Sequence, residues 1–296
     1  MLEARSNVRA RDVLGPSSAL SAELPGYELR SAQLEMAEAV ERALESEHHL
    51  FVEAGTGTGK TLAYLVPAVL SNRKVVVSTA TRALEEQIVE KDLPILARAL
   101  APLGVVPSVA VMKGMSNYVC RRRLAEALAE RPGDDALARI AEWVKETESG
   151  DRAELPQLPE SSPAWTVAAS GPDTRIGASC KHFEECFVTR MRREAERAQI
   201  VVVNHHLFFA DLALRSGPRG DYAGVIPAYD AVIFDEAHQI ESIATDFFGI
   251  RVSSARIEKL ASDARRALTA AGHLSVLGTG PAARLTESLA SAGAAL

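Results

Sequence analysis

The segment Glu53–Thr61, with the sequence EAGTGTGKT, constrains the fold of this chain more than any other feature. The apolar residues 49–53 before it have the pattern of a short strand, and residues 60–71 have the apolar periodicity of a helix. A strand, a glycine-rich loop and a helix in this order form the setting of a phosphate-binding P-loop. Glycines allow backbone N–H groups to turn inward, where they bind phosphate together with the helix N-terminus. The segment therefore predicts an α/β domain that binds a nucleoside triphosphate.

Residues inside this loop have separate predicted roles. Lys60 is expected to reach the β- and γ-phosphates, and the Thr61 hydroxyl is expected to ligate Mg²⁺. Ala54 stands where the motif G-x-x-x-x-G-K-S/T has its first glycine, which is a mild departure from the pattern. The alternative is a glycine-rich turn before an ordinary helix, and the flanking strand and helix argue against it. The predicted ATP-binding residues of the loop are Ala54, Gly55, Thr56, Gly57, Thr58, Gly59, Lys60 and Thr61.

A second motif, AVIFDEAH at Ala231–His238, supplies the acidic groups that such a site needs. Its first four residues form an apolar run of the kind buried in a parallel sheet, and ligands bind at the carboxyl ends of such strands. Asp235 is expected to hold Mg²⁺ through water, and Glu236 to orient and deprotonate the attacking water. His238 is better placed to sense the γ-phosphate. An acidic pair after a strand is often a helix cap or a solvated face, but the P-loop upstream favours a catalytic site of Glu236, Asp235 and Lys60.

The two motifs together resemble those of superfamily-two helicases, and the finer match is to the DinG/XPD-like iron–sulfur DNA helicases. Further segments point the same way, so that the resemblance covers about residues 10–250. The segment Pro25–Val40 looks like that family's entry segment, in which Gln33 corresponds to the glutamine that reads the adenine edge. On the residues alone, Gln33 would be taken as a plain polar residue on an amphipathic helix.

Two more segments resemble motifs of the same family, and one of these motifs contacts DNA. Val75–Val89 looks like the motif in which Ser78, Thr79 and Thr81 touch the DNA backbone. Val201–Leu212 resembles the segment just ahead of the DEAH strand. The family implies ATP and Mg²⁺ as cofactors, single-stranded or forked DNA as the partner, and contacts with replication or repair proteins. It also implies 5′-to-3′ movement, although no residue of the chain shows a direction.

The stretch between Lys60 and Asp235 is much longer than one or two βα units, which take about 30 residues each. The surplus predicts an inserted module at about 113–198. Cys120, Cys180 and Cys186 all lie in it, and the chain has no other cysteine. The odd cysteine count and the lack of a signal peptide argue against a disulfide framework.

The resemblance implies a four-iron, four-sulfur (4Fe–4S) cluster in this module, normally held by four cysteines. In register with the family, the fourth cysteine should fall near Arg175, and arginine cannot ligate iron. Three interpretations stand: Asp173 or His182 is the fourth ligand, the cluster is a labile one with three cysteines, or this member has lost it. Three ordinary thiols in a module without a cluster are the competing interpretation.

Basic residues crowd the same module. Arg190, Arg193 and Arg197 recur at helical spacing on one face, and arginine forks suit phosphate oxygens. We expect these side chains to grip single-stranded DNA at the duplex fork. Such a stripe is more often a solvated face, and nearby glutamates dilute it. Further arginines directly follow Cys120, at Arg121, Arg122 and Arg123.

The composition is that of an ordinary globular protein, with 47% hydrophobic and 24% charged residues over 296 positions. No run reaches about 18 apolar residues, so the sequence predicts no membrane partner and a cytoplasmic location. The net charge of −6 gives no indication of nucleic-acid binding. Local patches of basic residues, rather than the total charge, decide whether a protein binds nucleic acid. His205 and His206 are adjacent and point to different helix faces, so we interpret them as structural or DNA-adjacent rather than as metal ligands.

Strand and helix patterns alternate, which predicts a parallel sheet with helices on both faces. Strands are expected at 49–53, 74–79, 107–112, 200–203 and 231–234. Helices are expected at 31–46, 60–71, 82–100, 120–131, 135–148, 185–198 and 237–245. Asn204 is a good N-cap for one more helix. The Pro-, Ser- and Glu-rich stretch 149–170 is expected to be a loop.

The predicted fold is a RecA-like P-loop parallel sheet with an inserted, mostly helical iron–sulfur-type domain and the start of a helical arch domain. The expected boundaries are 1–112 and 199–250 for the motor domain, 113–198 for the insertion and 251–296 for the truncated arch. Helicases of this type need two RecA-like domains, so the chain looks like an N-terminal portion that lacks the second motor domain. Alone, it is expected to bind nucleotide weakly and to unwind negligibly.

The leading functional hypothesis is an ATP-dependent DNA helicase or single-stranded DNA translocase that acts in repair or replication. A catalytically inactive DNA- or partner-binding module that responds to redox state is the alternative. A P-loop ATPase unrelated to nucleic acid is the third hypothesis, and the DEAH motif and the Thr79 region argue against it.

Overall fold

The computed structural model describes residues 8–24, 26–55, 57–216 and 224–248, together with Ser288 and Ser291. The chain divides into two compact units, Met1–Ile243 and Ala244–Leu296. The sheet and the inserted module both belong to the first unit. Apart from the two serines, the predicted start of an arch domain lies outside the described residues.

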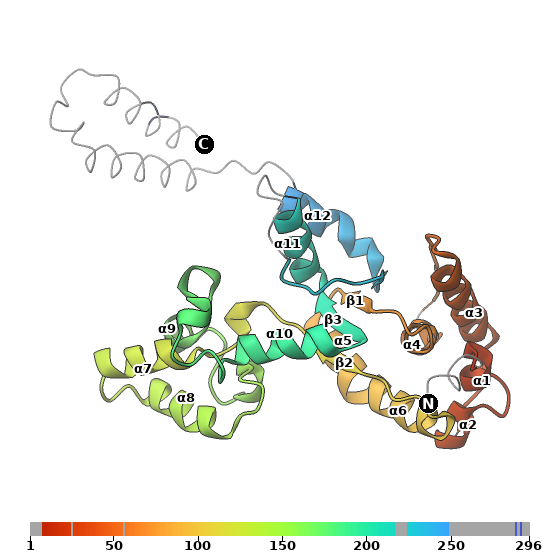
Figure 1. Ribbon diagram of the computed structural model, residues 1–296, viewed down its shortest axis with the longest axis horizontal. Helices are drawn as coiled ribbons and strands as arrows, with labels where there is room; N and C mark the ends of the chain where they lie inside the picture. Colours follow the sequence, from red (N-terminus) through yellow and green to blue (C-terminus); the bar gives the residue numbers. More distant parts are fainter. Residues whose placement is uncertain are drawn as a thin grey trace. The chain divides into compact units, whose positions relative to one another are not determined.

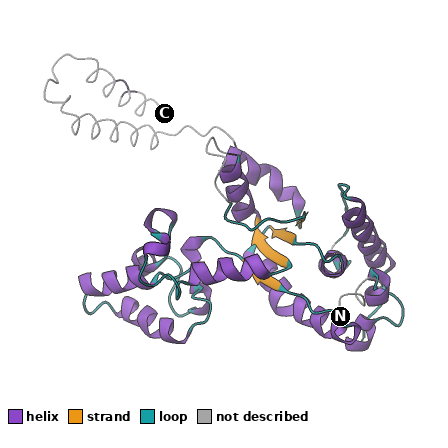
Figure 2. Cartoon of the chain, in the orientation of Figure 1, coloured by secondary structure: helices purple, strands orange, loops and turns teal. Residues whose placement is uncertain are grey.

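Parallel strands form a single sheet in the described part of the first unit (Figures 1 and 2). Their order is β2-β3-β1-β4, so that β1 lies between β3 and β4. The strands are β1 Val75–Thr79, β2 Val109–Val111, β3 Ile200–Asn204 and β4 Ala231–Phe234. The predicted parallel sheet is confirmed, and four of the five predicted strands lie where the sequence placed them. The arrangement is that of a RecA-like α/β domain.

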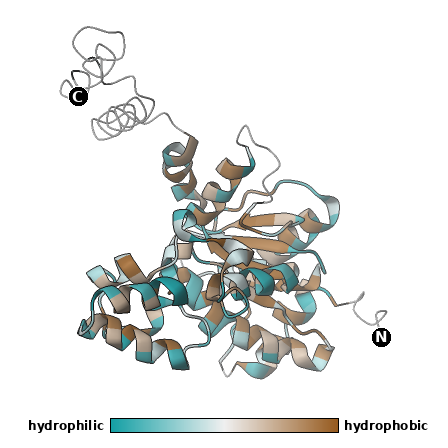
Figure 3. Ribbon diagram, turned by 60° about the vertical axis from the view of Figure 1, so that its left-hand side comes forward, coloured by the Kyte–Doolittle hydropathy of each residue, from teal (hydrophilic) through white to brown (hydrophobic). Residues whose placement is uncertain are grey.

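Both faces of the central strands are covered, which is why their sequences are almost continuously apolar. Every residue of β1 is buried, and so are the first four residues of β3. Val75 and Val77 of β1 pack with Ile200 and Val202 of β3 in one hydrophobic core, as alternation along parallel strands requires. The strands appear as the hydrophobic interior of the unit in Figure 3.

N-terminal helices cover part of this core. Helix α3 packs against α4 and α1, and α2 packs against α6. The helices are α1 Ala10–Leu14, α2 Ala19–Glu23, α3 Ser31–Ser46, α4 Lys60–Leu70, α5 Arg82–Gln87 and α6 Leu93–Leu100. The helix predicted at 82–100 is interrupted by a π-helical turn, Ile88–Asp92. Pro94 explains the interruption, because proline has no N–H for the preceding turn and its ring crowds the carbonyl four residues earlier.

The insertion is mostly helical, as predicted. Its helices are α7 Arg121–Glu130, α8 Asp135–Glu146, α9 Pro163–Ala168 and α10 Phe187–Arg197. Trp143 of α8 and Trp165 of α9 meet edge to face, with ring centroids 6.0 Å apart. The prediction of a continuous loop at 149–170 was wrong at α9. Ser162 caps that helix and Pro163 occupies its first position, a start signal that the composition of the stretch obscured.

The chain returns to the sheet through β3, and helix α11, His205–Arg215, follows at once. Asn204 caps this helix as predicted, because its Oδ1 accepts a hydrogen bond from Leu207 N at 2.8 Å. Helix α12, Ile240–Phe248, follows β4 after a short turn. Single 3₁₀ turns occur at Ala101–Leu103, Met115–Asn117, Arg152–Glu154, Pro172–Thr174, Gly177–Ser179 and Ala237–Gln239.

The strand predicted at 49–53 was wrong for the described residues. This segment has no strand assignment, and Phe51 is 95% exposed, with Leu50 and Val52 also exposed. Apolar alternation creates a strand only when a neighbouring strand supplies hydrogen bonds, and no described strand pairs with 49–53. The P-loop therefore follows an exposed segment that pairs with no described strand.

Candidate nucleotide-binding site

Two glycines give the P-loop its shape. Gly57 and Gly59 have φ angles of +79° and +78°, the left-handed region that residues with a Cβ rarely adopt. Gly59 is also the N-cap of α4, so Lys60 and Thr61 open the first helical turn, where N–H groups point outward. A Cβ at Gly59 would lie 2.1 Å from Nε2 of Gln33. Glycine is therefore required there by both the backbone and a close neighbour.

Side chains before the loop hold it in place. Gln33 on α3 is buried and donates a hydrogen bond from Nε2 to Gly59 O at 2.9 Å. Arg30 donates to the carbonyl of Gly57. Within the loop, Thr58 Oγ1 donates to Gly55 O at 2.9 Å. The carbonyls are thereby turned towards α3 and the loop itself, which leaves amide groups free to face an anion. Ala54 is half-buried at the start of the loop, and Thr56 lies outside the described residues.

The acidic motif lies at the carboxyl end of β4, beside the end of β1. Asp235 N donates to Ser78 O at 2.9 Å, which continues the β1–β4 ladder by one residue. Asp235 is 9% exposed, and its carboxylate accepts a hydrogen bond from Tyr64 Oη at 3.2 Å. The Thr61 hydroxyl is near enough to that of Tyr64 to lower its pKa slightly against the effect of burial. Thr61 and Asp235 thus both lie near the Tyr64 hydroxyl, and their hard oxygen donors fit Mg²⁺.

Burial sets the protonation of this pair. It raises the pKa of Tyr64 well above its ordinary value, and the negative charge of Asp235 adds to the effect, so Tyr64 remains a hydrogen-bond donor. Burial also raises the pKa of Asp235, opposed by the hydrogen bond from Tyr64. The charge of Glu236 raises the Asp235 pKa further, and that of Lys60 lowers it. A cation at this carboxylate would relieve the cost of burying it.

Lys60 and Glu236 form an ion pair across the site. Lys60 Nζ lies 3.2 Å from Glu236 Oε1, and both side chains are about one-third exposed. Glu236 has a left-handed backbone, with φ 54° and ψ 47°, which is uncommon for a residue with a side chain. This turn directs its carboxylate back towards the P-loop. His238 Nδ1 lies 3.4 Å from Glu236 Oε2 and is largely exposed. The three predicted catalytic residues are therefore brought together, and His238 adjoins them.

The predicted DNA-contact hydroxyls differ in exposure. Ser78 is fully buried, with its Oγ 2.6 Å from Nδ1 of the buried His205. Thr79 is also buried and donates from Oγ1 to Thr81 O at 3.3 Å. Thr81 is exposed and caps α5 by accepting from Leu84 N at 3.3 Å. Of the three hydroxyls, that of Thr81 alone is exposed. Burial lowers the pKa of His205, which keeps its ring neutral inside the fold.

The arginine stripe of α10 is partly neutralised. Arg193 makes a two-pronged ion pair with Glu184, at 2.7 and 3.2 Å, and lies over the ring of Phe183. Arg190 is half-buried, with its guanidinium carbon 6.0 Å from the Phe187 ring centroid. Arg197 at the end of the helix is exposed. Arg197 is thus the member of the stripe most open to a phosphate.

The three cysteines are free and half-buried. Cys120 precedes α7 and Cys186 precedes α10. Each cysteine has an arginine nearby. Arg122 lies within electrostatic range of Cys120 and Cys180, and Arg192 lies within range of Cys186.

These residues do not fit an iron–sulfur cluster. Within the described ranges, no three His, Cys, Asp or Glu side chains are grouped so that they could hold a metal. The suggested fourth ligand His182 instead lies 4.0 Å from Glu185. At the register of the expected fourth cysteine, Arg175 donates to Thr189 Oγ1 at 3.1 Å, which ties the loop before Cys180 to α10. A positively charged, hydrogen-bonded side chain thus stands where a thiolate is needed.

Sequence reasoning missed two contributors to the site, Tyr64 and Arg30. Tyr64 lies four residues after Lys60 on α4, and residues at this spacing share a helix face. That spacing could have revealed it. The contact of Arg30 with Gly57 spans 27 positions of sequence and has no local signal.

Comparison with known proteins agrees with this geometry. Residues 33–127 match the family described as DEAD/DEAH box helicase. The chain is 40% identical over 258 residues to the ATP-dependent DNA helicase YoaA of Escherichia coli K12, covering 85% of this chain and 40% of that protein. It is 36% identical over 253 residues to the ATP-dependent helicase DinG of Mycobacterium tuberculosis H37Rv, covering 77% and 37%. The 3′-5′ exonuclease DinG of Bacillus subtilis is 34% identical over 248 residues, covering 81% and 25%.

The chain therefore spans about 40% or less of the length of these curated relatives. No helix within the described ranges combines the length and the apolar character needed to cross a bilayer.

Proposed function

We propose that this chain, which carries a DEAD/DEAH box helicase domain and is homologous to DinG and YoaA helicases, binds and hydrolyses ATP to drive movement on single-stranded DNA. One observation carries the proposal. The P-loop and the DEAH motif, far apart in sequence, meet with Lys60 Nζ 3.2 Å from Glu236 Oε1. No observation favours the inactive-module alternative, and the proximity of Lys60 to Glu236 supports a hydrolytic site.

In the proposed mechanism, the amide groups around Gly57 and Gly59 and the first turn of α4 cradle the phosphates. Lys60 exchanges its partner, from the carboxylate of Glu236 to the β- and γ-phosphates. Thr61 and Asp235 are the residues that would hold Mg²⁺, which neutralises phosphate charge when bound. The Tyr64 hydroxyl, which lies beside both Asp235 and Thr61, would hold these two side chains in position.

Release of Lys60 leaves Glu236 free to act on water. We assign Glu236 the roles of orienting the attacking water and accepting its proton. Its left-handed backbone fixes the direction of the carboxylate. The adjoining His238 is proposed to sense the γ-phosphate through this contact with Glu236. Gln33 is proposed to read the adenine edge, and its hydrogen bond to Gly59 O would link base recognition to the shape of the P-loop.

For DNA, we propose contacts through Thr81 and through Arg190, Arg193 and Arg197 of α10. The exposure of Thr81 and Arg197 supports these two most strongly. We assign 1–112 and 199–250 to the motor domain and 113–198 to the insertion. Single-stranded or forked DNA is the proposed substrate, replication or repair proteins the proposed partners, and the cytoplasm the proposed location.

A nucleotide-binding titration tests the core of the proposal. Removing the Lys60 ammonium in Lys60→Ala should weaken ATP affinity about tenfold or more, because a charge-assisted contact to phosphate is lost. Lys91→Ala, which removes an exposed lysine outside the P-loop and the DEAH motif, is the matched control. Fluorescence of a labelled ATP analogue gives both affinities. Equal affinity in wild type and Lys60→Ala would contradict the proposed site.

A further inference from the structure

A cavity of the first unit is lined by a buried carboxylate that has no hydrogen-bond partner within the described ranges. Glu85 on α5 is 1% exposed, and neither of its oxygens has a hydrogen-bond partner among the residues that the structure describes. It lines a cavity of about 320 Å³, a volume within the range of small-molecule sites. Burying a carboxylate without a hydrogen bond or an opposite charge is costly. Among the described residues, no donor forms a hydrogen bond with Glu85 to offset this cost, although Lys113 and Arg82 lie within electrostatic range of it.

The cavity lies between the sheet and the insertion. Its walls come from α5 and the π-helical turn, from the edge strand β2, from α10 and from the loop at 148–151. The apolar lining residues include Val89, Val109, Val111 and Met191. A ligand there would touch elements of both the proposed motor domain and the inserted module.

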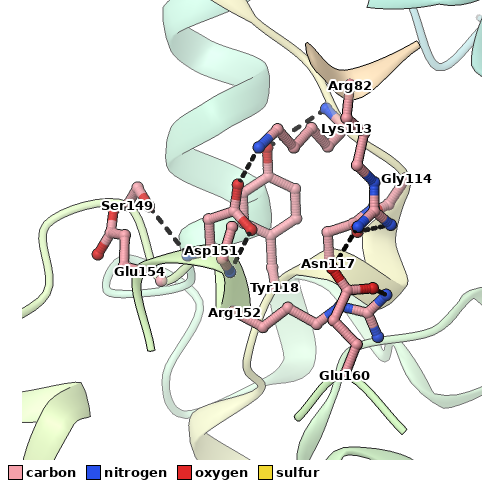
Figure 4. A network of polar contacts seen from close by, with 12 residues as sticks. Arg82, Lys113, Gly114, Asn117, Tyr118, Ser149, Asp151, Arg152, Glu154 and Glu160 are labelled. Carbon is pink, nitrogen blue, oxygen red and sulfur yellow. Dashed lines mark hydrogen bonds and ion pairs between the residues drawn. The ribbon is translucent and has the colours of Figure 1, made fainter. Parts of the chain in front are cut away.

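The nearest cation is already paired. Lys113 Nζ lies 2.5 Å from Asp151 Oδ2, and both side chains are about seven-eighths buried. Figure 4 shows Lys113 reaching towards Asp151 beside the ring of Tyr118. In the same view, Arg82 reaches Asn117, to which it donates a hydrogen bond at 2.9 Å. Arg82 also forms an ion pair with Glu160. Glu85 is thus left as a surplus negative group beside a completed ion pair.

Most of the other charged residues that line the cavity are negative. Four more glutamates face the cavity against one arginine, Arg190. These residues are Glu86, Glu90, Glu148 and Glu194. This surplus of negative charge disfavours an anionic group, such as the triphosphate of ATP, as the occupant of the cavity. A coordinated metal ion is not favoured either, because no described set of three acidic or other ligating side chains is grouped for one.

An organic cation fits both the negative charge and the apolar walls of the cavity. Its protonated amine can pair with a carboxylate, and its methylene groups can pack against apolar side chains. We propose that this cavity binds a small aliphatic ammonium group, with Glu85 as its buried anionic partner. The site is separate from the proposed ATP site and does not depend on it. Binding would bridge α5 and α10 and so stabilise the junction between the sheet and the insertion.

Protonation of Glu85 gives the site a pH dependence. Burial raises the pKa of Glu85 to about 7, opposed by the charges of Lys113 and Arg82 and assisted by those of Asp151 and Glu86. Below that pH the carboxyl is neutral and attracts a cation weakly. Affinity for an ammonium ion should therefore increase as pH rises through about 7.

Calorimetric titration with putrescine, an alkyl diamine, tests the proposal on the full chain at about pH 8. The neutral diol of the same length is the control ligand, and Glu130→Gln, which removes an exposed carboxylate of α7, is the control variant. Wild type and Glu130→Gln should bind the diamine and not the diol. Glu85→Gln should bind it about tenfold or more weakly. Unchanged affinity in Glu85→Gln, equal binding of the diol, or no binding by wild type would each overturn the proposal.

Two further arms keep the test decisive. Should Glu85→Gln fail to fold, the exposed double variant Glu148→Gln/Glu194→Gln should still lower the affinity about threefold or more, and unchanged affinity would count against the site. Titration with Nα-acetyl-lysine amide identifies the source of the ammonium group. Tighter binding of this ligand than of putrescine supports a lysine side chain of another protein, whereas the reverse order supports a free amine.

Discussion

Lys60 Nζ and Glu236 Oε1 lie 3.2 Å apart, although the two residues are separated by 176 positions of sequence. The ion pair joins the P-loop at the start of α4 to the turn that follows β4. Since both side chains are one-third exposed, the pair contributes little to stability and can exchange partners readily. We interpret it as a reversible ion pair. When it breaks, Lys60 becomes free to bind phosphate and Glu236 becomes free to act as a base.

Glu236→Gln separates binding from chemistry. The amide keeps the size of the side chain and cannot accept a proton from water, so ATP should still bind. We expect the rate of phosphate release to fall by about 10²-fold or more, the usual contribution of a positioned base. Single-turnover phosphate release, with nucleotide affinity measured in parallel, checks this. His238→Gln should keep hydrolysis within about tenfold of wild type. A Glu236→Gln protein with full activity would exclude the base assignment.

Gly59→Ala tests why glycine stands at the N-cap of α4. The new Cβ would meet Nε2 of Gln33 at 2.1 Å in a backbone with φ +78°. We expect a loss of about 2 kcal/mol or more in unfolding free energy and about tenfold weaker ATP binding. Gly104→Ala is matched to it, because Gly104 has φ +72° with open space around its missing Cβ. That variant should lose about 1 kcal/mol and no ATP affinity. Equal effects would mean that the contact with Gln33 is unimportant.

The position of Arg175 leads us to expect little iron in the insertion. Because its guanidinium is bonded to Thr189 where a ligand would be needed, protein purified without oxygen should contain much less than one cluster per chain. Iron and sulfide assays measure this directly. Cys186→Ser should leave the thermal midpoint nearly unchanged, whereas Arg175→Ala should cost about 1 kcal/mol by removing the link to α10. Four irons per chain, lost in Cys186→Ser, would contradict this expectation.

Glu85→Gln should change stability in a pH-dependent manner. Burial raises the pKa of Glu85 from 4.5 to about 7, so the folded state binds this proton more tightly than the unfolded state. The contribution of Glu85 to stability is therefore complete below about pH 4.5 and is lost as pH rises through about 7. At about pH 8 the variant should be more stable than wild type by about 1–3 kcal/mol, and at about pH 4 the difference should vanish. Urea unfolding at both pH values measures this, with Glu130→Gln as the flat control.

Much of the fold followed from local patterns. The helix at Ser31–Ser46, the cap at Asn204, and strands β1, β3 and β4 were predicted closely, because apolar periodicity and capping act over a few residues. Two misses have equally local causes. Pro94 widened a helical turn, and the start signal Ser162–Pro163 was hidden in a loop-like composition. Residues 49–53 are different, because their pattern was correct for a strand and only a neighbour could complete it.

Sequence by itself determined the chemistry available to this protein: glycines with left-handed backbones before Lys60, a hydroxyl at Thr61 and two carboxylates at a strand end. These properties reside in single residues and short segments, so a linear pattern can encode them. Tertiary structure decided which groups meet and which are hidden. It joined Lys60 to Glu236, buried Ser78 against His205 and tied Arg175 to Thr189. It also left Glu85 without a hydrogen-bond partner in the part of the chain that the structure describes. Distance and burial between remote segments depend on how the sheet and the insertion pack, and no local pattern contains that information.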